Sequence, residues 1–88
     1  MKVQHFYTYV AVSDLYQQQC GEAGVISVFQ SAFAQCVQAN GGMQPVLESW
    51  TPLSSKEAKA IGLSHHHQVT WYRIDGSGVQ GLLVGAVH

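Results

Sequence analysis

The sequence predicts an α+β fold, in which one long and one short helix pack on a mostly antiparallel four-stranded sheet. The predicted order along the chain is β-α-β-α-β-β. Three observations lead to this prediction: a strand-like segment followed by apolar residues at helical spacing, a capping box at residues 54–57, and a turn signal at residues 75–78 between two strand-like segments. A chain of 88 residues has room for a single domain, which we place at 1–88.

The first predicted strand covers residues 3–12, which are rich in aromatic and β-branched residues and contain no Gly or Pro. Side chains alternate between the two faces of a strand, so this segment has two different sides. We expect the helices to cover the apolar side, formed by Phe6, Val10 and Val12. The opposite side is amphipathic and suits a second layer, a partner or a ligand; it is formed by His5, Tyr7 and Tyr9.

The long helix is predicted from Val25 onward, because apolar residues recur there with a period near 3.6. They are Val25, Ile26, Phe29, Ala32, Phe33, Cys36 and Val37. The Asn-Gly-Gly run at residues 40–42 is a typical helix stop. Residues 13–24, before the helix, are predicted to form a loop with room for a short helical turn at 15–19.

The rest of the chain divides into four elements. Residues 43–50 form a predicted strand with Pro45 near its start and Pro52 just after its end. Ser54 and Glu57 open a short helix, which we expect to end at residues 61–63 with Gly62 in the left-handed conformation. Residues 68–75 and 79–87 are predicted to pair as a hairpin.

The amino-acid composition favours some classes of binding partner and argues against others. Apolar residues make up 47% of the sequence and charged residues only 10%, and residues 23–47 contain no charge. Because a surface so poor in charge is typical of one covered by another chain, we predict a homo-oligomer, most simply a dimer. The net charge of −1 and four dispersed Lys and Arg residues argue against nucleic-acid binding. The sequence shows no basic amphipathic helix, signal segment or membrane-spanning run, which predicts a cytoplasmic protein without a membrane partner.

The cysteines and the histidine run do not predict a metal site or a disulfide framework. Cys36 lies on the apolar side of the predicted helix, where we expect it to be buried as a small hydrophobe. Cys20 lies at the helix entrance, where the helix dipole would favour a thiolate. The three histidines at 65–67 would alternate in direction if extended, and no nearby Cys or carboxylate completes a tetrahedral set. We therefore interpret that run as a polar turn and predict no bound metal.

The segment from Gln18 to Ala23 carries the one functional motif. Gly21 permits backbone conformations closed to other residues, and the following helix offers free amides that suit a phosphate. Gln18-x-x-Gly21-x-Ala23, between an apolar strand and an amphipathic helix, resembles the acyl-CoA-binding signature Arg/Gln-x-x-Gly-x-Gly/Ala of the GNAT acetyltransferase superfamily. The predicted order of elements is similar to the C-terminal half of that fold, a GNAT-like half domain.

The resemblance implies an acetyl-CoA site. The backbone of Val10, Ala11 and Val12 would hold the thioester and the pantetheine arm, and the amides of residues 19–23 would hold the pyrophosphate. The implied cofactor-binding residues are Val10, Ala11, Val12, Gln18, Gln19, Cys20, Gly21, Glu22 and Ala23.

The chain also departs from the family pattern. Ala58 stands where the family often has a tyrosine general acid, Cys20 and Glu22 replace basic or glycine residues, and the half of the domain that builds the acceptor site is missing. No catalytic residue is therefore assigned, and an N-acetyltransferase would need a partner chain to complete it. The alternative is a non-catalytic protein-interaction module that docks another protein, or a second copy of itself, through the His5, Tyr7 and Tyr9 side of the sheet, with Trp71 as a further candidate contact.

Overall fold

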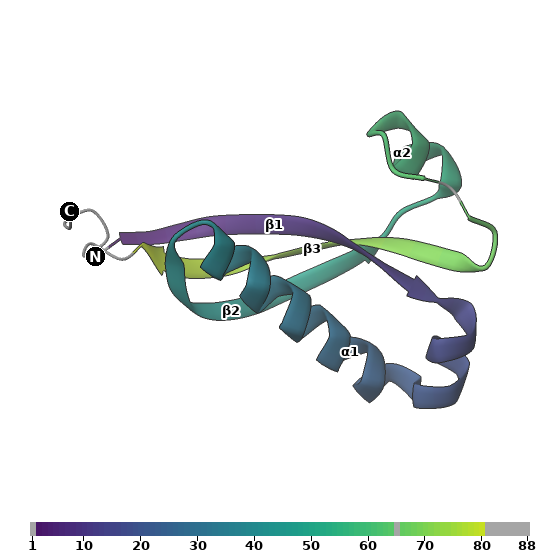
Figure 1. The fold of residues 1–88 in the computed structure, drawn as a ribbon, viewed down its shortest axis with the longest axis horizontal. Coiled ribbons are helices and arrows are strands. Elements are labelled where there is room, and N and C mark those ends of the chain that lie inside the picture. Colours follow the sequence, from purple (N-terminus) through teal and green to yellow (C-terminus); the bar gives the residue numbers. More distant parts are fainter. Residues whose placement is uncertain (1, 65, 81–88) are drawn as a thin grey trace.

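A three-stranded antiparallel sheet with the strand order β1-β3-β2 forms the centre of the fold, and the long helix crosses one of its faces (Figure 1). The structure is a computed structural model that describes residues 2–64 and 66–80. Its elements are β1 (Lys2–Ser13), α1 (Asp14–Ala39), β2 (Gly42–Pro52), α2 (Ser55–Ala60) and β3 (Val69–Gln80). The α+β class is thus as predicted.

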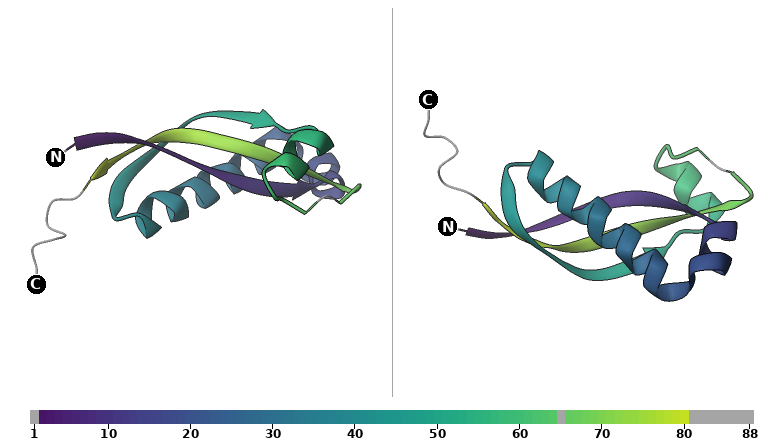
Figure 2. Two further views of the ribbon diagram at one scale, coloured as in Figure 1. Left: turned by 90° about the horizontal axis from the view of Figure 1, so that it is seen from above. Right: turned by 60° about the horizontal axis from the view of Figure 1, so that its bottom comes forward.

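The central strand is β3, the last in sequence, and it pairs antiparallel with both β1 and β2. Since both outer strands run opposite to β3, they run parallel to each other and are linked by α1. Figure 2 shows α1 on one side of the sheet only. The core lies between that face and the helix, and it consists of Phe6, Val12, Val25, Phe29, Phe33, Val37 and Ile74. The predicted inward side of β1 is therefore confirmed.

The predicted four-stranded sheet is wrong, because residues 75–78 do not turn but continue β3. Gly76 and Gly78 lie beneath α1: a Cβ on Gly76 would come within 2.7 Å of Phe33 Cζ, and one on Gly78 within 2.7 Å of Val37 Cγ1. These glycines thus allow the helix to approach the sheet closely, which is the other common use of glycine within a strand. Residues 81–87 of the predicted fourth strand lie outside the described residues.

The predicted loop at 13–24 is also wrong, because α1 begins directly after β1. Ser13 caps the helix by accepting a hydrogen bond from the Tyr16 backbone N–H at 3.0 Å. The short turn expected at 15–19 is part of this first helical segment. Gly21, with φ 66° and ψ −169°, interrupts the helix with a kink, and the second segment runs to Ala39 as its apolar spacing predicts.

The small helix α2 has the predicted capping box. The Ser54 hydroxyl accepts from the Glu57 backbone N–H at 3.1 Å, and the Glu57 carboxylate accepts from the Ser54 backbone N–H at 2.8 Å. Gly62, with φ 87°, follows the helix in the expected left-handed conformation. Neither helix of the described part of the chain is long and apolar enough to cross a bilayer.

Candidate functional site

The face of the sheet opposite α1 is the first candidate site, and we call it the open face. The register places Tyr7 opposite Asp75 and Tyr9 opposite Arg73, and the side chains of these four residues project away from the helix. The short helix α2 lies at one end of the sheet (Figure 1), where the Trp71 indole N–H donates to the Ser64 carbonyl at 2.8 Å. Between this end and the other, neither α1 nor α2 covers the open face.

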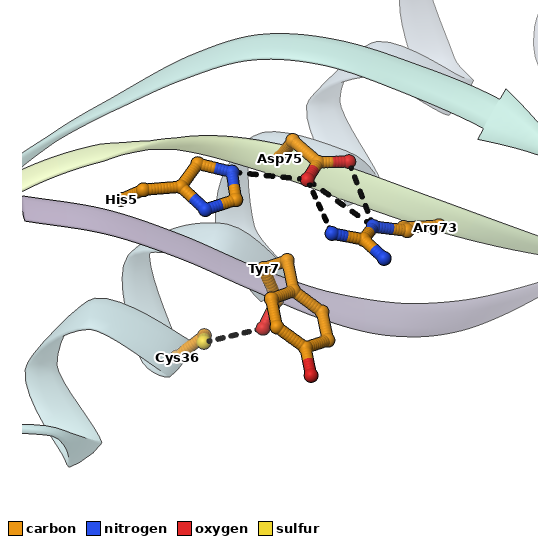
Figure 3. A network of polar contacts seen from close by, with 5 residues as sticks. All are labelled: His5, Tyr7, Cys36, Arg73 and Asp75. Atoms are coloured by element: carbon orange, nitrogen blue, oxygen red, sulfur yellow. Dashed lines mark hydrogen bonds and ion pairs between the residues drawn. The ribbon is translucent and has the colours of Figure 1, made fainter.

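A polar network orders the centre of the open face (Figure 3). The Arg73 Nε lies 3.2 Å from both carboxylate oxygens of Asp75, and Arg73 Nη2 lies 3.1 Å from Oδ1. His5 Nε2 lies 3.0 Å from the same Oδ1. The hydrogen bonds to Asp75 raise the pKa of Arg73 above its already high ordinary value, so the guanidinium is charged at any physiological pH.

The aromatic residues of β1 are arranged by this network. The Arg73 Cζ lies 4.1 Å from the centroid of the Tyr7 ring, which is a cation–π geometry. Tyr7 stacks on His5 with a centroid distance of 6.3 Å and meets Tyr9 edge-on at 5.9 Å. Tyr7 is nevertheless 50% exposed. The face therefore presents large, ordered aromatic surface to solvent, which is the kind of surface that binds a partner at low entropic cost.

Within residues 2–64 and 66–80, the open face holds some of the parts of a nucleophilic active site. A histidine held by an aspartate is one component of such a site, but the third component is a hydroxyl or thiol within reach. Among the described residues, no hydroxyl or thiol hydrogen-bonds to His5. The Cys36 thiol comes from α1, on the other side of the sheet, and donates to the Tyr7 backbone carbonyl at 3.5 Å. The His5–Asp75 pair therefore has no hydrogen-bonded nucleophile in the part of the chain that the structure describes.

The sequence placed His5, Tyr7 and Tyr9 together, and the structure confirms that they share one face. The sequence does not predict Arg73 and Asp75 as site residues: it predicts Arg73 within a strand and Asp75 at the junction of that strand and a turn. The alternation of Trp71, Arg73 and Asp75 was a usable signal that they share a face. Which β1 residues they meet depends on the register, which no local pattern encodes.

The segment at the Gly21 kink is the second candidate site. Gln18, Gln19, Cys20, Glu22 and Ala23 are all exposed on α1, close to the kink. Val10, Ala11 and Val12 lie near the end of β1, where they are paired with Tyr72, Trp71 and Thr70 of β3. The GNAT-like half-domain fold is therefore corrected on a decisive point: β3 lies between β1 and β2, so these two strands do not form the splayed, neighbouring pair between which that family admits its cofactor.

Other residues considered for chemistry are dispersed. Ala58, at the position of the family's tyrosine acid, is buried at 2% exposure on α2. Cys20 is exposed and Cys36 is half-buried beside the core, not fully buried as expected. The rings of His66 and His67 are stacked, and His65 lies outside the described residues. No group of three or more metal-ligating side chains occurs within residues 2–64 and 66–80.

Comparison with known proteins gives no assignment: the chain matches no protein-family model, no curated protein and no solved structure. The function is therefore inferred from the two features described above, the open face and the Gly21 kink.

Proposed function

We propose that the chain is a protein-interaction module that binds a second copy of itself through the open face. The observation that carries this proposal is the ordered aromatic row of β1, with the Arg73 guanidinium over its Tyr7 ring, on a sheet face that α1 leaves uncovered. Exposed aromatic and arginine side chains are the residues most enriched in the energetically important centres of protein interfaces.

A second copy fits this face because the face is complementary to itself. Arg73 and Asp75 place one positive and one negative charge at its centre, so a two-fold axis that passes between them would bring each charge toward the opposite charge of the second copy. Val46, 55% exposed, lies on the same face and adds apolar area to it. The low charge of the whole chain, 10%, is typical of a subunit whose surface is partly covered.

Sedimentation of the purified chain over a range of concentrations tests this proposal. We expect a reversible dimer, and we expect Tyr7→Glu to weaken it by more than about tenfold because the new carboxylate would be desolvated in the interface. Gln30→Glu adds the same charge at an exposed position of α1 and should leave the dimer unchanged. A wild-type chain that stays monomeric at all concentrations, or a Gln30→Glu variant as defective as Tyr7→Glu, would contradict the proposal.

Acyl-CoA binding is the second candidate. The conformation of Gly21 favours it, since φ 66° with ψ −169° is essentially confined to glycine and opens the backbone at the start of a helical segment. The position of β3 between β1 and β2 and the carboxylate of Glu22 weigh against it. Calorimetry with acetyl-CoA is the direct test, and no detectable binding at millimolar ligand would remove this candidate.

A further inference from the structure

A pocket lies at the kink of α1, on the helix side of the sheet and thus away from the open face. Its volume is about 280 Å³; it is lined by residues of α1, β2 and β3 and is open to solvent. The residues that line it include three aromatic ones, Phe29, Trp50 and Tyr72, and two at the kink, Gly21 and Glu22. This volume is near the lower end of ligand pockets, about 300–1,000 Å³, and suits one small chemical group.

The aromatic walls form a cluster around Phe29. The Phe29 ring centroid lies 4.9 Å from that of Tyr72 and 5.7 Å from that of Trp50, and the planes are tilted by 57° and 43°. The Tyr72 hydroxyl donates to Gln17 Oε1 at 3.0 Å, which holds that ring in place. Trp50 remains 38% exposed. Phe29 itself is 0% exposed, so the aromatic surface that a ligand can reach belongs to Trp50 and to the half-buried Tyr72.

The charge of the pocket selects for a cation. Glu22 is the one charged residue among those that line it, and none of them is Lys or Arg. Aromatic faces carry negative electrostatic potential, so a ring face turned toward the pocket acts in the same direction as the carboxylate. A phosphate would meet this potential unfavourably. Gly21 adds space at the rim, because no atom lies within 4 Å of the position that a Cβ would occupy.

We propose that this pocket binds an organic cation, a quaternary or methylated ammonium group, between the carboxylate of Glu22 and the rings of Trp50 and Tyr72. Such a group is recognised by aromatic rings because its charge is spread over methyl groups that lose little hydration on binding. The group can belong to a free small molecule or to a methylated lysine side chain, and both present the same chemistry to the pocket.

Nuclear magnetic resonance on the isotope-labelled wild-type chain provides the test, with tetramethylammonium chloride as the probe and sodium chloride as the ionic-strength control. The chain has two tryptophans, whose indole N–H signals can be assigned with a Trp71→Phe variant. We expect the signal of Trp50 and the amides around Gly21 to shift saturably, while the signal of Trp71 stays in place as an internal control.

Two comparisons decide whether charge drives the binding. Tert-butanol has a similar shape without the charge and should bind at least about tenfold more weakly, and Glu22→Gln should weaken tetramethylammonium by about tenfold. Glu48→Gln, an exposed carboxylate change on β2, should have no effect. Equal binding of tert-butanol, an unaffected Glu22→Gln variant or an unmoved Trp50 signal would each overturn the proposal. If it stands, choline and an amide of N-acetyl-trimethyllysine are compared, and the tighter of the two identifies the source of the cation.

Discussion

Gly76 of β3 lies so close beneath Phe33 of α1 that a Cβ on the glycine would come within 2.7 Å of the Phe33 ring. The same Cβ would also collide with the backbone carbonyl of Val46 on β2. Phe33 is 1% exposed, so its ring cannot swing outward without opening the core. One glycine thus sets the distance between the helix and the sheet at the middle of the molecule.

Replacement of Gly76 by alanine should therefore destabilise the fold. We expect a loss of about 1–3 kcal/mol in the free energy of unfolding, because the methyl group would force apart a close-packed contact. Urea unfolding followed by circular dichroism measures it. Ser77→Ala, at the next position of β3, should change stability by less than about 0.5 kcal/mol. A Gly76→Ala variant as stable as Ser77→Ala would contradict the close approach.

The kink of α1 depends on Gly21 for a different reason. A Cβ at this position meets nothing within 4 Å, so alanine fits in space, but the backbone conformation is one that other residues rarely adopt. We expect Gly21→Ala to cost about 1–3 kcal/mol through backbone strain alone. Gln19→Ala, an exposed change two residues before the kink, should be close to neutral. If Gly21→Ala were neutral as well, α1 would be able to continue straight through this position.

The capping box of α2 predicts a dependence of stability on pH. Hydrogen bonds from Ser54, its backbone N–H first and its side chain second, lower the pKa of Glu57. A pKa that is lower in the folded state means that the carboxylate stabilises the fold above the pKa of the unfolded chain, and that this stabilisation is lost as the pH falls through the folded value. The loss should begin below about pH 5.

Thermal unfolding of wild type and Glu57→Gln at several pH values tests this dependence. Wild type should be the more stable at neutral pH, and the difference should shrink as the pH falls, since the protonated glutamate resembles glutamine. Glu48→Gln is the matched control, because within the described residues Glu48 has no side-chain hydrogen bond. A difference between wild type and Glu57→Gln that is constant with pH would show that the carboxylate does not cap α2.

Local patterns predicted the elements that depend on local physics and missed those that depend on distant contacts. The apolar spacing from Val25 to Val37, the alternation in β1 and the Ser54–Glu57 box each express an interaction between near neighbours in sequence, and all three are present. The turn predicted at Gly76 is wrong because this glycine packs closely against Phe33, which lies 43 positions earlier in the chain. The two uses of glycine, in turns and in close approach, are indistinguishable without the tertiary contact.

The candidate sites divide in the same way. Which β1 side chains share the open face follows from alternation alone, whereas their partners Arg73 and Asp75 are brought in by the register with β3. Similarly, the motif around Gly21 correctly marked an unusual backbone, but it carried no information about strand order. The placement of β3 between β1 and β2 depends on contacts between residues far apart in the sequence. It leaves no gap between neighbouring β1 and β2 strands, where the resemblance would place the cofactor.

The energetic coupling between the side chains of Arg73 and Tyr7 gives the sharpest test of the open face. The strand register pairs Arg73 with one tyrosine, whereas its side chain contacts another. Arg73 pairs across the strands with Tyr9, yet its guanidinium lies over the ring of Tyr7, 4.1 Å from the centroid. A double-mutant cycle with Arg73→Met and Tyr7→Leu should therefore be non-additive, by about two- to fivefold in the unfolding equilibrium constant.

The parallel cycle with Arg73→Met and Tyr9→Leu serves as the control and should show the smaller coupling, because Tyr9 is the cross-strand neighbour but does not lie under the guanidinium. Both cycles remove the same cation and a tyrosine from the same face, so general effects of hydrophobicity and charge cancel between them. They must be measured at a concentration where the chain is monomeric, since dimer formation would add its own free energy to each variant. Stronger coupling to Tyr9 than to Tyr7 would show that the guanidinium lies over its cross-strand neighbour, and the aromatic row of the open face would then lack the cation that orders it.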